Sequence, residues 1–271
     1  MKNIKNLILG CGVLILLMTA CTKDEIKYDT SVVRNYELEL NGDPWNLNVG
    51  ISTLPIFIYK ENGDYFGNYS SLYRFALNNG QYSFIATDIP AQMITSPVNL
   101  KDLIIPQLVT ADQKVNLSAA VPYASPFSDT LKMNILTRTG TLRLKAKDIV
   151  ADPSYVNIKV TVFVKRTGYK PVDETFVQGD MSVNKTKKTT TGGINYLDDF
   201  IVFQTDDTAN NVRAKIEFMD ANSVIVKTKE FAGTFPVLPN GITNVDFNLN
   251  DPDTPIIKDY VVTINGVVVP N

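Results

Sequence analysis

Two kinds of side chain in this sequence could carry chemistry: a cysteine near the start and several aspartate pairs. Cys21 stands in the segment MTACTKDE, and the only other cysteine is Cys11. The chain has no histidine, which excludes catalysis by Ser-His-Asp or Cys-His groups. Zinc and iron–sulfur sites built from cysteine clusters are excluded as well. With no phosphate-binding glycine-rich loop and no GxSxG motif, we expect a protein that is not an enzyme and holds no cofactor.

The acidic pairs are Asp198-Asp199, Asp206-Asp207 and Asp251 with Asp253. Calcium favours carboxylate oxygens in loops, but none of these pairs has the spacing of an EF-hand. Asp199 and Asp207 could also serve glycoside hydrolysis, which needs two carboxylates roughly 5 to 10 Å apart. Acidic turns are ordinary in β proteins, so the favoured interpretation is solvated loops and no metal site.

The residues before Cys21 have the order of a secretory signal peptide. Lys2 and Lys5 give a basic start, and residues 7–20 form the apolar run LILGCGVLILLMTA. This run has the length of a signal h-region and is shorter than the roughly 20 residues of a bilayer span. A short membrane anchor is the alternative. The segment LLMTAC resembles a bacterial lipobox, which implies cleavage between Ala20 and Cys21 and lipid on Cys21.

Lipid on Cys21 would hold the protein on the outer membrane. Each buried CH₂ contributes about 0.8 kcal/mol, and one acyl chain anchors a protein only marginally. Two or three chains, palmitate among them, would make the anchor permanent. Residues 22–25, TKDE, resemble the lysine-plus-acid export signal of surface lipoproteins of the Bacteroidota. We therefore expect exposure at the cell surface. The alternative is that TKDE is an ordinary polar tether and that the protein faces the periplasm.

Net charge argues against a nucleic-acid partner. The formal charge is −2, whereas nucleic-acid binders show a basic patch. Lys185, Lys187 and Lys188 do cluster, but in a Thr/Gly-rich stretch without interleaved aromatic residues. We interpret this stretch as a solvated loop.

The dominant pattern along the chain is an alternation of apolar and polar residues with period two, which is typical of half-buried strands. It is clearest at residues 155–165, where Val156, Ile158, Val160, Val162 and Val164 would share one face. The same alternation occurs in YELEL, TLRLKAK and VRAKIEF. No segment has a helical stripe with caps, apart from a short helix or turn near residues 99–103.

Turn residues separate the apolar runs. ENGD at residues 61–64 and NNGQ at residues 78–81 predict hairpins, because Asn-Gly tolerates positive φ at both positions. Asp220–Ser223 separates two further strands. We therefore expect an all-β chain of antiparallel β-sandwiches. We expect a signal peptide at residues 1–20 and a lipidated tether at residues 21–34. The first sandwich would cover residues 35–135 and the second residues 136–250, followed by a C-terminal strand segment at residues 251–271.

Four sequence segments together resemble those of a known family. PIFIYKENGDYFG, FALNNGQYSFIATD, TRTGTLRLKAKDI and LPNGITNVDFNLN are similar to strand and turn patterns of the FimB-like fimbrial anchor lipoproteins of the Bacteroidota. The resemblance implies two tandem transthyretin-like domains on a lipid anchor and a role in fimbria assembly or adhesion. Subunits of that family join by donating a β-strand to a neighbour, where main-chain hydrogen bonds supply affinity.

The C-terminal segment could be such a donated strand. Tyr260, Val262 and Ile264 alternate along it, and Gly266 separates them from three valines. The hypothesis is that this strand pairs with a partner fimbrial subunit. The alternative, which we favour, is that it folds back as the last strand of its own domain or packs between the two domains.

Glycan binding is the rival function, that of a surface lipoprotein in polysaccharide uptake. Trp45 could be an exposed sugar platform. A cluster of aromatic residues near the first hairpins could also bind sugar rings. Its members are Tyr59, Tyr65, Phe66, Tyr69 and Tyr73. Aromatic residues in strands are, however, more often part of the core. Two segments, Asp-Thr-Leu at residues 129–131 and Asp-Thr-Ala at 207–209, resemble the O-glycosylation acceptor of exported Bacteroidota proteins. They make Thr130 and Thr208 predicted acceptors.

Overall fold

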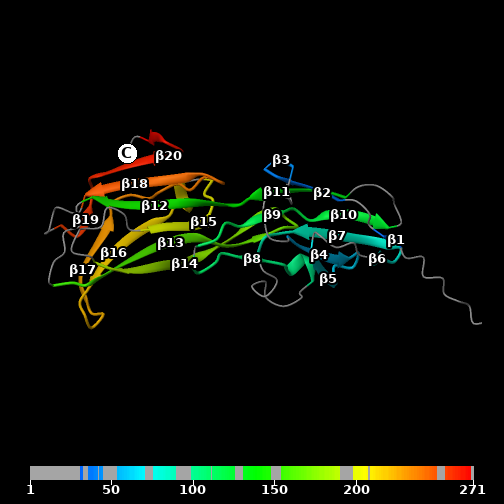
Figure 1. The fold of residues 1–271 in the computed structure, drawn as a ribbon, viewed down its shortest axis with the longest axis horizontal. Coiled ribbons are helices and arrows are strands. Elements are labelled where there is room, and N and C mark those ends of the chain that lie inside the picture. The colour runs from blue at the N-terminus through cyan, green and yellow to red at the C-terminus, as the bar shows by residue number, and fades with distance from the viewer. Residues whose placement is uncertain are drawn as a thin grey trace, which may run out of the picture.

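A computed structural model of the chain consists almost entirely of β-strands (Figure 1). It describes residues 31–32, 36–41, 43–44, 54–70, 76–89, 99–110, 112–125, 131–147, 154–189, 198–206, 208–248 and 254–269. The helices within these ranges are two single 3₁₀ turns, η2 (Leu100–Asp102) and η3 (Thr208–Asn210). In the described part of the chain, no helix has the length and apolar character needed to cross a membrane.

Strands β1 to β7 and β9 to β11 occupy one end of the molecule in Figure 1 and form three small sheets, whereas β8 pairs with a strand of the other end. One has the order β10-β7-β4-β5, the second β3-β2-β11-β9, and the third pairs β1 with β6. Their bounds are β1 Ser31–Val32, β2 Tyr36–Leu40, β3 Asp43–Pro44, β4 Pro55–Lys60, β5 Tyr65–Ser70, β6 Ala76–Leu77, β7 Gly80–Ala86, β8 Ile105–Pro106, β9 Asn116–Ser118, β10 Val121–Ser125 and β11 Leu131–Thr137.

Strands β12 to β21 occupy the other end and form two larger sheets. The five-stranded sheet has the order β15-β12-β18-β20-β21, and the other runs β14-β13-β16-β17-β19, with β8 pairing to β13. Their bounds are β12 Thr139–Lys147, β13 Asn157–Lys170, β14 Thr175–Lys188, β15 Asp198–Phe203, β16 Arg213–Met219, β17 Ile225–Phe231, β18 Ile242–Asn248, β19 Ile256–Ile257, β20 Tyr260–Ile264 and β21 Val267–Val269.

The all-β prediction is confirmed, but the expectation of purely antiparallel sheets is wrong. Three strand pairs are parallel: β2 with β11, β12 with β18, and β17 with β19. Each pair joins strands that are distant in sequence. Apolar alternation reports which face of a strand is buried but not the direction of its neighbour, so the pattern carries no signal for these pairs. The predicted domain limits stay predictions.

Two of the predicted turns differ from expectation. ENGD does connect an antiparallel pair, β4 and β5, but as a four-residue loop in which Gly63 alone has positive φ, at 82°. NNGQ does not form a hairpin, because β6 pairs with β1 while β7 pairs with β4 and β10. The turn at Asp220–Ser223 joins β16 to β17 as predicted, and the Asp220 carboxylate accepts from the amides of Asn222 and Val224.

The cores lie between sheets, where the alternating residues meet. In the C-terminal group, the apolar residues of TLRLKAK and VRAKIEF are buried together with Ile158, Val160, Val162 and Val164 of β13. Val156 is an exception to the predicted face, because β13 begins at Asn157 and leaves Val156 40% exposed. The lysine-rich stretch predicted as a loop is also a strand, since residues 185–188 end β14.

A third apolar cluster joins the two groups of sheets. It combines Phe57 and Tyr59 of β4 with Ile105 of β8, Tyr169 of β13 and Phe203 of β15. The contact is made possible by the length of β13, whose far end pairs with β8. Gly168 sits at this pairing, and a Cβ there would lie 2.5 Å from Ile104 Cγ2. A larger residue at this pairing would require the Ile104 side chain to move.

Candidate functional site

Several residues predicted to carry function lie outside the described residues. These are the cleavage and lipid-attachment residues Ala20 and Cys21, the acceptor Thr130, the aromatic residues Trp45 and Tyr73, and the aspartates Asp207, Asp251 and Asp253. Lipid attachment, signal cleavage and glycosylation at these positions stay predictions. Thr208 is described and is exposed in η3, so its hydroxyl is accessible, and its glycosylation also stays a prediction.

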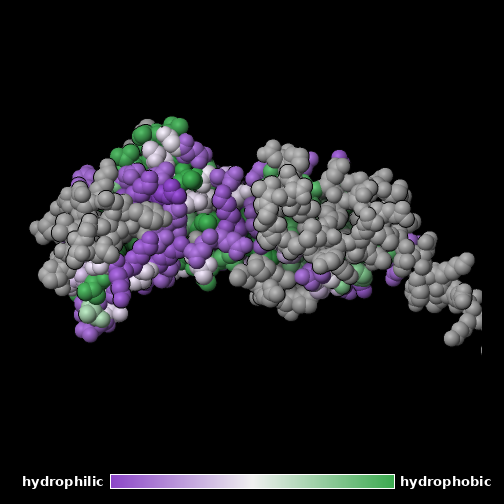
Figure 2. All heavy atoms as spheres, in the orientation of Figure 1, coloured by the Kyte–Doolittle hydropathy of each residue, from purple (hydrophilic) through white to green (hydrophobic). Residues whose placement is uncertain are grey.

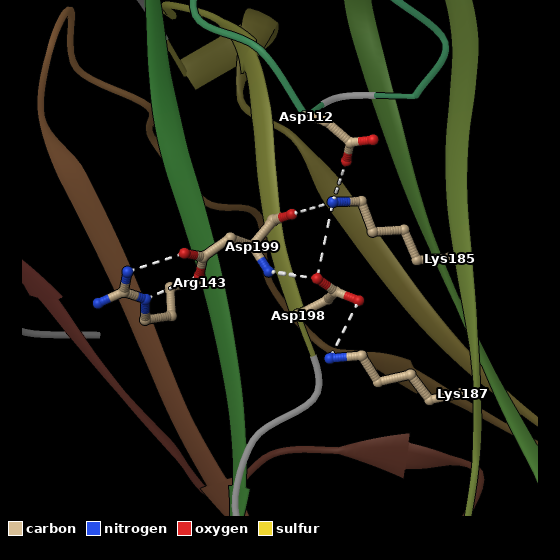
Figure 3. A network of polar contacts seen from close by, with 6 residues as sticks. All are labelled: Asp112, Arg143, Lys185, Lys187, Asp198 and Asp199. Atoms are coloured by element: carbon tan, nitrogen blue, oxygen red, sulfur yellow. Dashed lines mark hydrogen bonds and ion pairs between the residues drawn. The ribbon is translucent and has the colours of Figure 1, made fainter.

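Asp198 and Asp199 belong to a network of ion pairs between strands (Figure 3). Asp199 accepts two hydrogen bonds from Arg143 of β12, at 2.7 and 2.8 Å. Asp198 lies 3.3 Å from Lys187 Nζ and 3.6 Å from Lys185 Nζ, both on β14. Lys185 also contacts Asp112 at 2.6 Å. These carboxylates are therefore compensated by cations, and no group of metal-binding side chains is found among the described residues.

The network has a structural consequence for the sandwich. β14 is an edge of one sheet and β15 an edge of the other. Lys185 donates to the backbone carbonyl of Asp199 at 2.7 Å, so β14 is tied to β15 directly. Lysine-rich edges also discourage pairing with further strands. This side of the C-terminal sandwich is closed by its own side chains.

Asp206 has a structural partner as well. Its carboxylate pairs with Arg166, whose side chain is 2% exposed and lies over the ring of Phe176 at 4.0 Å. Hydrogen bonds from Arg166 and Asn210 hold the pKa of Asp206 below its usual range. This contact stabilises the buried guanidinium and leaves Asp206 committed to a structural role.

Among the described aromatic residues of the first hairpins, Tyr59 is core, and Tyr65 and Phe66 are half-buried and pack against the core. Tyr59 is 1% exposed, and its ring meets that of Tyr65 edge-on with centroids 5.7 Å apart. Burial raises the pKa of Tyr59 to about 12, and the neighbouring Tyr65 adds to the shift. Phe66 packs edge-on against Tyr82 at 5.9 Å. These contacts favour the core interpretation over a sugar platform at Tyr59. The side chain of Tyr69 is outside the description.

The C-terminal segment forms a hairpin at one side of the five-stranded sheet. β20 pairs antiparallel with β18 along its whole length, from Tyr260 to Ile264. Val262 is 5% exposed within the core. Tyr260 packs edge-on against the rings of Phe231 and Phe235, at 5.8 and 5.6 Å. In this structure the strand thus pairs within its own chain, and its donation to a partner stays a prediction.

A second strand, β21, follows β20 after a tight turn and was missed by the sequence interpretation. Asn265 and Gly266 have φ values of 49° and 87°, and Ile264 pairs with Val267. Positive φ at both central residues is the type I′ geometry that Asn-Gly favours in two-residue hairpins. The Asn-Gly step between two apolar runs is the sequence signal for this hairpin.

β21 leaves an apolar edge exposed. Val267 is 70% and Val268 62% exposed, and β21 ends its sheet. Figure 2 shows hydrophobic atoms gathered at the top of the molecule, where Figure 1 places this hairpin. Because Ile264 and Val267 flank the turn, they form the hydrogen-bonded pair, and Val268 belongs to the next, non-hydrogen-bonded pair. The N–H and C=O of Val268 therefore point away from β20.

Comparison with known proteins identifies the fold. No family model and no curated protein matches the chain. A Bacteroides thetaiotaomicron structure described as a candidate polysaccharide-binding protein matches with a TM-score of 0.55 and 11% identity, over 86% of this chain and 96% of the other. A candidate adhesin from the same species matches with a TM-score of 0.52 and 10% identity, over 89% of this chain and 98% of the other.

The fimbrial anchor protein Mfa2 from Porphyromonas gingivalis matches with a TM-score of 0.50 and 10% identity, over 88% of this chain and 98% of that one. At such identities a match establishes fold alone. The predicted resemblance to fimbrial anchor proteins is confirmed at that level: this chain has the fold of the Mfa2 anchor and of the Bacteroides candidate adhesins.

Proposed function

We propose that the protein is a non-enzymatic cell-surface subunit that anchors or assembles a fimbria and takes part in adhesion. Lipid on Cys21 would hold it on the outer membrane, with residues 35–135 and 136–250 as two transthyretin-like domains. The lipobox-like sequence and the shared fold with a fimbrial anchor support this proposal. Protein partners, in this account, bind by adding a β-strand to a sheet.

The exposed edge at β21 is the observation that carries the proposal. Strand addition needs an edge whose backbone groups are free and whose side chains can pack against a partner. β14 and β15 are tied to each other by ion pairs, and β19 has two residues. At β21, by contrast, Val267 and Val268 stand exposed. Among the described edges of the C-terminal sheets, β21 fits a partner strand best.

Energetics favour addition to β21 over release of the hairpin. Donating β20 would break its pairing with β18 and expose Val262 together with the aromatic contacts of Tyr260. Burying one valine contributes about 1.5–3 kcal/mol, so release carries a substantial cost before any partner is gained. Addition to β21 breaks no existing pair. We therefore assign β21 the role of acceptor, with donation of β20 as the competing outcome.

Capture of partners from intact cells tests this role. Val268→Pro removes the outward N–H that a partner strand needs, and proline is tolerated on a sheet edge. Val268→Thr keeps the N–H in a β-branched residue of similar size and serves as the matched control. We expect the wild type and Val268→Thr to capture a β-sandwich subunit. Val268→Pro should capture at least tenfold less of that subunit.

Two outcomes would contradict the proposal. Equal capture by Val268→Pro and the wild type would exclude strand addition at β21. Failure of the wild type to capture any β-sandwich protein would exclude the assembly role itself. Circular dichroism of each variant establishes that its own sheet is intact.

A further inference from the structure

A hollow of about 400 Å³ lies on the outer face of the other large sheet, away from β21. β13, β14 and β16 form its floor, and η3 lies at one side. Its lining includes the ring of Phe163 and the polar side chains of Lys165, Asp180, Ser182 and Arg213. The volume falls within the usual range of small-molecule sites. No residue predicted from the sequence to bind a ligand, other than the glycosylation candidate Thr208, lies in it.

The hollow contains one close ion pair and one further cation, Arg213. Lys165 Nζ lies 2.5 Å from Asp180 Oδ1, and hydrogen bonding from Lys165 holds the pKa of Asp180 below its usual range. These two side chains therefore neutralise each other. Just beside the hollow, Lys215 bonds to Glu217 at 2.5 Å. The charge of Arg213 also helps to lower the pKa of Asp180, but among the described residues no carboxylate forms an ion pair with the Arg213 guanidinium.

Arg213 is held in place by an aromatic ring. Its guanidinium carbon lies 5.3 Å from the centroid of Phe163, within the range of a cation–π contact. Such a contact attracts the guanidinium to the ring but uses none of its N–H donors. The five donors form a planar fork that matches a carboxylate bidentately. Among the described residues the Arg213 guanidinium has no ion-pair partner, so its donors can bind a ligand.

The remaining lining suits a sugar ring. Ser182, Thr208, Asn211 and Thr234 provide hydroxyl and amide groups that can donate to and accept from sugar hydroxyls. Met181 and Ala209 add apolar surface for the C–H groups of the ring. A nucleic acid is a poor candidate, because Asp180 lines the hollow and the chain carries a net charge of −2.

We infer that this hollow binds an acidic saccharide unit, with its carboxylate on Arg213 and its hydroxyls on the neutral side chains. The site would give the protein a glycan-binding activity separate from strand addition, because the hollow and β21 belong to different sheets. A saccharide and a partner strand could then bind at the same time.

Isothermal titration calorimetry with two α-1,4-linked trisaccharides, one charged and one neutral, tests the inference. Trigalacturonate carries carboxylates, whereas maltotriose has the same type of α-1,4 linkage without them. We expect trigalacturonate to bind at least tenfold more tightly than maltotriose. Arg213→Gln should weaken trigalacturonate binding at least tenfold, and Lys188→Gln, which removes an equal charge from an exposed position on the same sheet, should change it less than twofold.

Three results would overturn the inference: equal affinity for both trisaccharides, unchanged binding by Arg213→Gln, or no binding of trigalacturonate by the folded wild type. Arg213 is exposed, so its replacement is expected to leave the fold intact, which circular dichroism checks. Arg213→Gln should still capture the partner subunit. Loss of saccharide binding with retained capture therefore separates this site from the proposed assembly role.

Discussion

Replacing Gln107 with leucine is expected to weaken the junction between the two groups of sheets. Gln107 is 4% exposed and follows β8. Its side-chain oxygen accepts from the amide of Phe203 at 2.8 Å, and its nitrogen donates to the carbonyls of Ile201 at 3.1 Å and Leu108 at 3.2 Å. One amide side chain thus takes the place of a neighbouring strand along part of β15.

The size of the effect follows from the groups left without partners. Leucine has a similar volume but can neither donate nor accept, so the amide of Phe203 and the carbonyl of Ile201 lose their partners. Each buried polar group left unsatisfied costs about 1–3 kcal/mol. For two such groups we therefore expect a loss of about 2–6 kcal/mol in the free energy of unfolding, a large part of the stability of an ordinary domain.

Urea unfolding followed by circular dichroism measures this loss. Gln113→Leu is the matched control, because Gln113 is exposed and makes a single 3.3 Å hydrogen bond to the carbonyl of Asp88. The control should stay within about 0.5 kcal/mol of the wild type. If Gln107→Leu unfolds at the same urea concentration as the control, the reasoning about the junction is refuted. A transition that splits in two would instead show that Gln107 couples the two groups.

Three further predictions follow from burial. Truncation after Pro255 removes the buried apolar side chains of β19 and β20 and should lower the free energy of unfolding by about 3–6 kcal/mol; an unchanged urea midpoint would mean that the hairpin is free to leave its sheet. Tyr59, with its pKa raised to about 12, should stay protonated where exposed tyrosines ionise, so stability should fall by about 2–3 kcal/mol between pH 10 and pH 12. Absorbance at 295 nm against pH would contradict this if every tyrosine titrated near pH 10. Gly140→Ala places a Cβ 2.1 Å from the carbonyl oxygen of Leu238 and should lower the free energy of unfolding by about 1–3 kcal/mol. A thermal midpoint equal to that of the wild type would rule out this close approach.

The strands that alternation predicts are those whose apolar residues share one face of a sheet. In β12 and β16, the alternating apolar residues that the sequence indicates do enter the core, although neighbouring residues such as Thr141 and Glu217 are buried as well. β13 was predicted too short, because beyond Val164 the register shifts twice and the alternation is lost, although the strand continues to Lys170. A β-bulge keeps a strand in its sheet while it breaks the period of two.

The features that were not predictable depend on contacts between distant segments. The parallel pairs need a neighbour that local sequence does not specify. The lone Arg213 on Phe163 becomes visible only when β13 and β16 lie side by side. Asp198 and Asp199 were read as solvated, because their cations come from other strands. The β20–β21 hairpin is different, since its Asn-Gly step was present in the sequence as a local signal.

Hydrogen exchange of β21 in the captured complex tests the central claim most directly. The amide of Val268 points outward in the free protein and should exchange quickly. Binding of a partner strand at this edge predicts slower exchange in the peptide covering residues 264–269, with the exchange of β18 and β20 unchanged. Unchanged exchange at residues 264–269, or faster exchange of β18 as β20 leaves it, would contradict addition to β21.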